Sequence, residues 1–523
     1  MALALIISAT AALAAVFCSY QLVQHYQLSA YHIPEYFINI KKSLLLKLAI
    51  WSVASFAALL GITNALKLLD GHYYLLGLAA FIAAMTFLSV KQFKRRYKTP
   101  LKFTHRILRY LFILFLVNFG FWIGIVDALL KFPIINYSII GLTPVVNYLL
   151  CGVAAIIAAP MELILQTKYI YLAKKKLASM PNLKIIGITG SFGKTSVKFI
   201  LQKLLEGQYK VCASPNSYNT PMGLCRAINE NLKPDDQIFI AEMGARRKGD
   251  IAKLCEIATP DIAVITAIGE QHLATFKSIE RVAKTKYEII ENLKPQGLAV
   301  FNCHSPIVLD LYNTTTQNKL MVGASENSFA YYSEPQTFNR GSKFKLTIDN
   351  QSIDCVTALL GMHNIGNITL AAAIAYKLGV SLEDIAQKIT ELKPAPHRLQ
   401  LIESAGMTII DDSFNANLEG AKAALDVLRS FLQKKVVITA GLVDMGKRQK
   451  SVNEELGKYI AGAADWCIIT GPNSLYIYDG LVKANFSPKR IRVCDNLNQA
   501  VNILNSISGS KVVLFQNDLP DNF

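Results

Sequence analysis

The sequence is poor in charged residues, and the shortage lies at one end of the chain. Charged side chains make up 17% of the 523 residues, against roughly 25% in an ordinary soluble domain. Residues 1–180 contain only 4 acidic residues beside 17 lysines and arginines, whereas the remainder contains 33 acidic and 37 basic residues. The chain is too long for a single core, and we expect about three domains, of which the first differs in kind from the others.

Paired cysteine motifs are also missing. The nine cysteines are scattered, with no CxxC pair and no spacing typical of metal ligands. This pattern argues against a disulfide framework or a zinc site and favours buried thiols in a reducing compartment. No GxGxxG motif occurs in the last 125 or so residues, so the sequence gives little support there for binding a dinucleotide.

Five apolar stretches in the first 180 residues approach the ~20 residues that a helix needs to cross a bilayer. They cover residues 1–20, 48–66, 73–90, 107–126 and 139–159. The first lacks the basic leader of a signal peptide, so we expect an uncleaved anchor. Basic connections after the first, third and fifth stretches predict that everything after Lys176 is cytoplasmic. The sequence therefore predicts an N-terminal helical transmembrane bundle over residues 1–180, with basic loops facing anionic membrane lipid and no nucleic-acid surface.

Two asparagines fall within these apolar stretches. Asn118 and Asn147 would place amide groups at membrane depth. Such amides either line a lipid or substrate groove or form hydrogen bonds between helices. The sequence leaves both interpretations open.

A glycine-rich motif, GITGSFGKTS at residues 187–196, follows a short apolar run and precedes a helical pattern. Glycines in such a strand-to-helix turn let backbone N–H groups converge on phosphate, and the helix adds its positive dipole end. We expect Lys194 to reach the outer phosphates and the Thr195 hydroxyl to bind Mg²⁺. The alternative is a glycine-rich turn with a chance Lys-Thr pair. The predicted nucleotide-binding residues are Gly190, Ser191, Gly193, Lys194, Thr195 and Ser196.

Strand and helix patterns alternate after Lys176. Predicted strands at 183–189, 237–243, 261–268 and 297–302 indicate a mostly parallel sheet covered on both faces, and residues 317–354 are predicted to form a small β insertion. After a predicted hinge at 393–398, strands at 407–411, 435–440, 466–470, 491–493 and 511–515 indicate a second α/β domain. We place these two domains at residues 181–395 and 396–523.

Seven sequence blocks between residues 181 and 523 resemble, in order, those of the Mur ligase family. They are GITGSFGKTS at 187–196, AEMGA at 241–245, IGEQHL at 268–273, AKTKYEI at 283–289, GMHNIGN at 361–367, HR at 397–398 and DDSFNAN at 411–417. They are most similar to the blocks of members that add D-alanyl-D-alanine. The resemblance implies an α/β P-loop central domain, a Rossmann-like C-terminal domain, and an ATP-dependent, ADP-forming acid–amino-acid ligase.

The same resemblance implies the metal-binding and catalytic residues. Thr195 and Glu242 would bind a first Mg²⁺, and His272 with a carbamylated Lys286 would bind a second. Lys194, Lys286, His272 and Arg398 would be catalytic. Outside the family context, Glu242 is interpreted as a solvated carboxylate at a strand end and His272 as an ordinary loop histidine. Lys284 competes with Lys286 for the modified position.

Further residues are implied to bind nucleotide or substrate. Asn364, Asn367, Arg398 and Asp412 would contact ATP, whereas Asn216, Tyr218, Asn219, Asn415 and Asn417 would contact the substrates. Helix capping is the alternative for Asn364 and Asn367 and for Asn417.

The chain departs from the family at both ends. Apolar stretches occupy the place of the UDP-binding domain, and the last residues lack a basic Lys-Gly-Ser-Arg segment. We therefore predict a multi-pass ligase of the bacterial plasma membrane that joins a carboxylate acceptor to an amino acid or dipeptide, such as D-alanyl-D-alanine, during peptidoglycan synthesis. Other cell-envelope synthesis proteins are expected partners. Alternatives are a poly-amino-acid or lipid-linked-substrate ligase and, from another class, a non-catalytic nucleotide-binding membrane scaffold.

Overall fold

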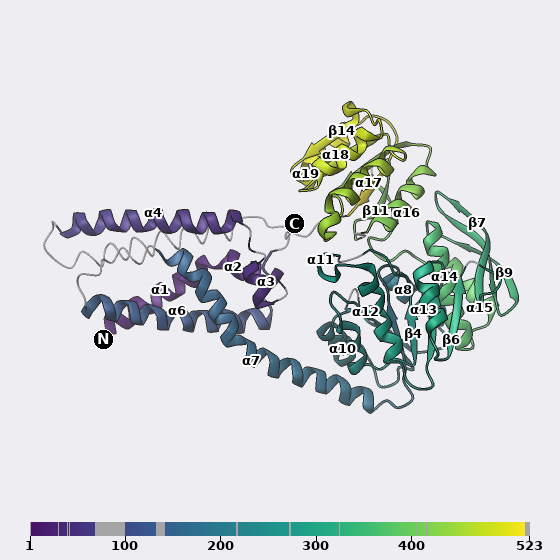
Figure 1. Cartoon of the computed structure of the whole chain (residues 1–523), viewed down its shortest axis with the longest axis horizontal. Helices are drawn as coiled ribbons and strands as arrows, with labels where there is room; N and C mark the ends of the chain where they lie inside the picture. Colours follow the sequence, from purple (N-terminus) through teal and green to yellow (C-terminus); the bar gives the residue numbers. More distant parts are fainter. Residues whose placement is uncertain are drawn as a thin grey trace. The chain divides into compact units, whose positions relative to one another are not determined.

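The computed structural model divides the chain into two compact units, Met1–Thr167 and Lys168–Leu519 (Figure 1). It describes residues 2–29, 31–38, 40, 42–67, 100–131, 142–215, 218–270, 273–323, 325–404, 406–414 and 417–517. The predicted site residues Asn216, His272 and Asn415 lie outside these ranges, as does the predicted apolar segment at 73–90.

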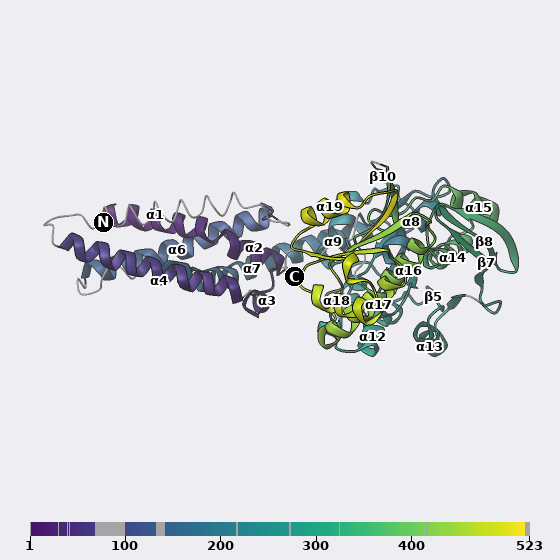
Figure 2. The same cartoon turned by 90° about the horizontal axis from the view of Figure 1, so that it is seen from above.

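The described part of the first unit is helical. Its helices are α1 (Ala2–Cys18), α2 (Tyr20–Leu28), α3 (Ile33–Ile38), α4 (Lys42–Lys67), α6 (His105–Lys131) and α7 (Thr143–Ala178), the last of which continues into the second unit. Helices α1 and α6 lie side by side in both views (Figure 1 and Figure 2). A buried cluster that includes Tyr26, Tyr36, Tyr110 and Leu114 joins α2, α3 and α6.

Two described helices are long and apolar enough to cross a membrane. They are His105–Ile125 in α6 and Pro144–Ala178 in α7, and a shorter apolar helix covers Leu44–Ala54. Helix α1 matches the first predicted stretch but has 17 residues. Two candidate helices do not support the predicted bundle of about five spans, which stays a prediction.

The two asparagines of the apolar stretches are buried. Asn147 donates a hydrogen bond across to α1, at 2.7 Å from the Ala15 carbonyl oxygen, and a second one to Ser19 Oγ. Asn118 donates to Leu114 of its own helix at 2.9 Å. Asn147 therefore joins two helices, and the groove interpretation is wrong for both residues because neither side chain reaches a surface.

The second unit begins with a nine-stranded sheet. Its strands are β1 (Lys184–Thr189), β2 (Val211–Ala213), β3 (Ile238–Glu242), β4 (Ile262–Ile265), β5 (Leu298–Asn302), β6 (Lys319–Gly323), β7 (Ala330–Phe338), β8 (Gly341–Ile348) and β9 (Gln351–Thr357). Their order is β2-β3-β1-β4-β5-β6-β7-β8-β9. The pairs from β2 to β7 are parallel, and β8 and β9 add in antiparallel fashion.

The prediction that residues 317–354 form a small β insertion of their own is wrong. Residues 319–357 instead extend the main sheet, because β6 pairs with β5 and β7 pairs with β6. Local alternation indicates strands but cannot show which sheet edge they will join. The sequence interpretation also missed β2, which has three residues.

Alternate residues of the central strands face two separate cores. Ile186 and Ile188 of β1 pack with α8 (Lys194–Leu205), α14 (Met362–Lys377) and α15 (Leu382–Thr390). Ile185 packs on the other face with α9 (Pro221–Arg226), α10 (Asp250–Ile257), α12 (Ile279–Glu291) and α13 (Pro306–Thr314). The sheet is covered on both faces, as predicted. The glycine-rich motif begins within β1 and continues beyond its carboxyl end.

A six-stranded sheet forms the rest of the unit. Its strands are β10 (Gln400–Ser404), β11 (Met407–Asp412), β12 (Lys434–Thr439), β13 (Trp466–Thr470), β14 (Ile491–Cys494) and β15 (Lys511–Gln516), in the order β10-β11-β15-β12-β13-β14. Helices α16 (Leu418–Arg429), α17 (Gln449–Ala461) and α18 (Ser474–Lys483) share one core with it, and α19 (Leu497–Ser506) packs in another. Only the antiparallel edge strand β10 was not predicted. All nine cysteines are free thiols.

Two glycines at the ends of α8 provide a matched stability test. Gly190 has φ +155°, and a Cβ there would lie 2.0 Å from Thr266 Oγ1, whereas Gly207 has φ +85° with open space around it. We expect Gly190→Ala to lower the free energy of unfolding by about 2–5 kcal/mol through backbone strain plus overpacking. Gly207→Ala carries the strain alone, and its loss is expected to be about 1 kcal/mol. Denaturant unfolding measures both, and equal losses would contradict the clash with Thr266.

Candidate active site

The glycine-rich motif forms a loop between β1 and α8. Gly193, with φ +83°, precedes Lys194, the first residue of α8. The loop is braced by residues that follow β4: the Ser191 amide donates to Ala267 O at 2.7 Å, and Thr266 Oγ1 donates to Phe192 O at 2.5 Å. The predicted nucleotide-binding residues from Gly190 to Ser196 therefore lie together at the carboxyl end of a parallel strand, where backbone N–H groups and a helix N-terminus favour phosphate.

Lys194 and Lys286 converge on one carbonyl oxygen. Lys194 Nζ lies 2.6 Å from the Gly190 oxygen, and Lys286 Nζ, which comes from α12, lies 2.8 Å from it. Burial lowers the pKa of Lys194 to about 8 and, together with the charge of Lys194, holds the pKa of Lys286 well below its ordinary value. Lys286 is 1% exposed. Burial thus favours the neutral form of the Lys286 amine, which lies close to Lys194.

Glu242 ends β3 and is 1% exposed. Its Oε2 accepts hydrogen bonds from Thr195 Oγ1 at 3.0 Å and Lys198 Nζ at 3.1 Å, and its Oε1 accepts from Asn219 Nδ2 at 3.0 Å. Burial alone would raise the pKa of Glu242, but the charges of Lys198 and Lys194 and these hydrogen bonds hold it below the ordinary value. Glu242 is therefore an ionised carboxylate, and its interpretation as a solvated strand end is wrong.

These oxygens fit part of the predicted metal set. The Thr195 hydroxyl and the Glu242 carboxylate lie together, and hard oxygen ligands suit Mg²⁺. Lys286 reaches the Gly190 carbonyl instead, and His272 lies outside the described residues. Within the described ranges, no three His, Cys, Asp or Glu side chains gather as a metal site.

Two predicted ATP-binding asparagines lie near the start of α14. Asn364 Nδ2 donates to Leu360 O at 2.8 Å, and Asn367 Nδ2 donates to Asn364 Oδ1 at 3.3 Å. Asn367 Oδ1 also lies 2.8 Å from the position that a Cβ on Gly193 would take, so it lies directly against the glycine loop. The capping alternative is wrong for both, because Gly361 is the N-cap of this helix.

Arg398 lies in a tight turn of the predicted hinge. Its neighbours His397 and Leu399 both have positive φ, and its guanidinium carbon lies 5.3 Å from the centre of the Phe414 ring. Burial lowers the pKa of Arg398, whereas the charges of Asp412 and Glu242 raise it. The charge of Arg398 in turn lowers the pKa of Lys194. Arg398 thus lies within electrostatic reach of Lys194 in the glycine loop, and its catalytic role stays a prediction.

The remaining predicted residues have mixed outcomes. Asp412 is 2% exposed, and its Oδ1 accepts from the Leu399 amide at 3.3 Å. Asn417 caps α16 by accepting from the Gly420 amide at 2.8 Å, which confirms its alternative role. The Tyr218 ring lies beneath the Arg226 guanidinium at 5.5 Å. The Asn219 side chain already donates a hydrogen bond to Glu242, so a substrate would bind Asn219 in addition to that contact.

Lys198 is a site residue that sequence reasoning missed. It is fully buried, and its ammonium group donates to Ser214 O at 2.8 Å as well as to Glu242. One signal was present in the sequence: Lys198 follows Lys194 by four residues on α8, which places both on one helix face.

Lys198→Met is expected to destabilise the protein by about 3–5 kcal/mol, because it leaves the buried Glu242 carboxylate without its principal counter-charge. The double variant Lys198→Met/Glu242→Gln should recover most of that loss, since neither charge remains. Lys203→Met on the same helix is the control, because its ammonium group pairs with Glu206 at the surface and little change is expected. Thermal unfolding measures all three. Equal destabilisation by the single and double variants would contradict the charge argument.

Comparison with known proteins places this geometry in a family. Residues 188–375 match the Mur ligase middle domain, and residues 397–516 match the glutamate ligase domain of Mur ligases. The UDP-N-acetylmuramoyl-tripeptide–D-alanyl-D-alanine ligase of Bacillus subtilis is 31% identical over 312 residues, which are 59% of this chain and 67% of that protein. The enzyme of the same name from Buchnera aphidicola is 32% identical over 303 residues, 57% of this chain and 66% of that protein.

Solved structures agree with the sequence matches. MurF from Acinetobacter baumannii has a TM-score of 0.62 at 25% identity, covering 68% of this chain and 77% of that one. The MurF ligase of Thermotoga maritima in complex with ADP has a TM-score of 0.60 at 28% identity, covering 68% and 80%. The chain spans between half and two thirds of the curated relatives named for this activity. The sequence matches, the fold and the glycine loop together show that the chain belongs to the Mur ligase family.

Proposed function

We propose that the protein is an ATP-dependent, ADP-forming amide ligase of the MurF type, which joins D-alanyl-D-alanine to UDP-N-acetylmuramoyl-tripeptide. The observation that carries the proposal is the cluster of Lys194, Thr195 and Glu242 at the glycine loop, in a chain whose relatives bear that enzyme name. The reaction belongs to peptidoglycan synthesis.

The chemistry brings two anions together. An acceptor carboxylate oxygen attacks the γ-phosphorus of ATP and ADP leaves; the amine then attacks the carbonyl carbon, phosphate leaves, and the nitrogen loses a proton. Lys194 and Arg398 would offset the negative charge that gathers in the first step. Lys194 must leave the Gly190 carbonyl to do so. The buried surroundings of the loop strengthen this attraction, since little water screens it.

Bound magnesium would supply further positive charge to offset the repulsion between the two anions. Thr195 and Glu242 would hold one ion through oxygen ligands. His272 and Lys286 would hold the second, as the family resemblance implies. Lys198 and Asn219 would keep the Glu242 carboxylate oriented.

We further propose that Lys286 carries a carbamate. The amine nitrogen would bond to the carbon of CO₂ and release a proton, which turns a side chain that repels metal into an oxygen ligand. Burial supports this modification because it favours the neutral, nucleophilic amine. Lys284, the rival position, is exposed on the same helix and lacks that environment.

We also propose that the protein is a multi-pass protein of the bacterial plasma membrane with its ligase domains in the cytoplasm. Two helices of suitable length and hydropathy support this location. The first 187 residues lie outside both family matches, and a membrane-bound or lipid-linked carboxylate acceptor is therefore the principal alternative substrate. A poly-amino-acid ligase and a non-catalytic nucleotide-binding scaffold are the further alternatives.

The substrate assay separates these candidates. Membranes that contain the protein are incubated with ATP, radiolabelled D-alanyl-D-alanine and either the soluble UDP-linked tripeptide or extracted lipid intermediates. Label should enter the soluble precursor, with ADP release that depends on both substrates. Incorporation into lipid alone would support the lipid-linked alternative. ATP hydrolysis unaffected by any acceptor or amine would contradict the ligase proposal.

The carbamate is tested by a matched pair of lysine variants. Lys286→Ala should reduce amide formation by at least about a thousandfold, the scale of losing a principal charge-stabilising group, and a short carboxylic acid should restore part of it. Lys284→Ala should remain close to wild type, because its side chain is exposed. Lys194→Ala should be inactive without rescue. Full activity of Lys286→Ala, or loss confined to Lys284→Ala, would show that Lys286 does not carry the group.

A further inference from the structure

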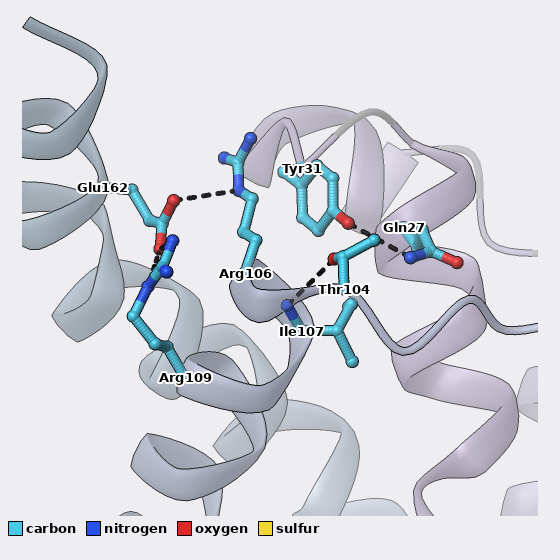
Figure 3. A network of polar contacts seen from close by, with 7 residues as sticks. All are labelled: Gln27, Tyr31, Thr104, Arg106, Ile107, Arg109 and Glu162. Atoms are coloured by element: carbon cyan, nitrogen blue, oxygen red, sulfur yellow. Dashed lines mark hydrogen bonds and ion pairs between the residues drawn. The ribbon is translucent and has the colours of Figure 1, made fainter. Parts of the chain in front are cut away.

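Two arginines of α6 share one carboxylate of α7, in the first unit (Figure 3). Arg109 donates to Glu162 Oε1 from Nε at 2.9 Å and from Nη2 at 2.7 Å. Arg106 Nε lies 3.3 Å from the other carboxylate oxygen. Glu162 is largely buried, with 12% of its side chain exposed. The cluster of Arg106, Arg109 and Glu162 therefore carries a net positive charge.

Each of the two guanidinium groups keeps N–H donors that do not bind Glu162. The Nη1 and Nη2 groups of Arg106 and the Nη1 group of Arg109 make no hydrogen bond among the described residues, and the side chains are 30% and 35% exposed. Figure 3 shows the two Nη groups of Arg106 pointing away from Glu162. Guanidinium donors of this kind form paired, planar hydrogen bonds to phosphate oxygens.

Neighbouring residues fix the position of the Arg106 side chain. Its guanidinium carbon lies 3.8 Å from the centre of the Tyr31 ring. Gln27 donates to Tyr31 OH at 3.1 Å and exchanges two hydrogen bonds with the Lys102 backbone, at 2.8 and 2.9 Å. The two hydrogen bonds with Lys102 hold the segment before α6 against α2. The donors of Arg106 are thus pre-organised, which reduces the entropy lost when a ligand binds.

Apolar side chains continue outward from this cluster along the same helices. Leu108, Phe112 and Leu116 recur every four residues of α6 and are 51%, 62% and 47% exposed. Leu163 and Ile164, next to Glu162 on α7, are 64% and 68% exposed. A cationic group at one end of an exposed apolar stripe is complementary to an anionic amphiphile.

We propose that Arg106 and Arg109 bind the phosphate group of an anionic membrane lipid, whose acyl chain lies along the exposed residues of α6. The proposal rests on the membrane location proposed above. Their three-residue spacing on α6 places the two arginines one helical turn apart, and Glu162 offsets one of their two charges. The phosphate restores neutrality, so the site distinguishes an anionic from a zwitterionic headgroup.

The test uses the full chain reconstituted in phosphatidylcholine vesicles with a minor fraction of phosphatidic acid, and native mass spectrometry measures the retained lipid. Wild type should retain phosphatidic acid in preference to phosphatidylcholine. Each of Arg106→Gln and Arg109→Gln should weaken that preference about tenfold, the equivalent of one charged hydrogen bond. Lys47→Gln removes an equal charge from α4 and should leave the preference unchanged.

Two further variants exclude simpler explanations. Arg106→Lys keeps the charge but loses the planar donors, so it should lose most of the preference; retention at the wild-type level would mean general attraction and overturn the site. Glu162→Gln frees both guanidinium groups and should strengthen retention. If retention is unchanged or weaker in Glu162→Gln, the arginines serve only to join α6 to α7, which also overturns the proposal.

The membrane location and the lipid site can fail separately. A chain that enters none of these vesicles contradicts the membrane proposal, and short-chain phosphatidic acid in solution then tests the site alone. A chain that enters the vesicles, while the Arg106→Gln/Arg109→Gln double variant retains lipid like wild type, contradicts the site alone. Inorganic phosphate bound as tightly, with the same dependence on both arginines, would identify a soluble ligand and overturn the lipid assignment.

Discussion

The electrostatic balance around the Gly190 carbonyl is the constraint on which the ligase unit depends. Lys194 and Lys286 both donate a hydrogen bond to that oxygen. Lys198 lies one helical turn after Lys194 on the same side of α8, and its ammonium group pairs with Glu242 of β3. So many buried charged groups are tolerated because each has a defined hydrogen-bond partner and because burial lowers the pKa of Lys194 and of Lys286. The helices on the two faces of the sheet exclude water from this place: α8 carries Lys194 and Lys198, α12 carries Lys286, and Glu242 ends β3 between them.

Local sequence spacing accounts for what could be predicted here. The glycines, Lys194 and Thr195 are contiguous, so one turn brings them together whatever else the chain does. Buried strands such as β1 and β13 were found because they are continuous apolar runs bounded by turns. Arg398 and Glu242 come from distant segments, and only the likeness to a family joined them to the loop in advance.

Other features have no local signal. A lysine in a helix is ordinarily at the surface, so the burial of Lys198 follows only once Glu242 and Ser214 are placed around it. The hairpin of β8 and β9 shows its alternation in sequence, but the sheet edge it extends depends on β6 and β7. Asn147 could equally have faced a groove or a neighbouring helix until Ala15 was placed opposite it.

Both carboxylate oxygens of Glu242 accept hydrogen bonds from the protein itself, and this has a consequence for the stability of the fold without metal. Its counter-ion is a side chain of the same domain, only 44 residues away in sequence, and Thr195 and Asn219 complete its hydrogen bonds. The side chains of the protein itself therefore neutralise this carboxylate and satisfy its hydrogen bonds, with no need of a metal ion for its burial. We expect removal of magnesium to stop catalysis while the fold of this domain stays intact.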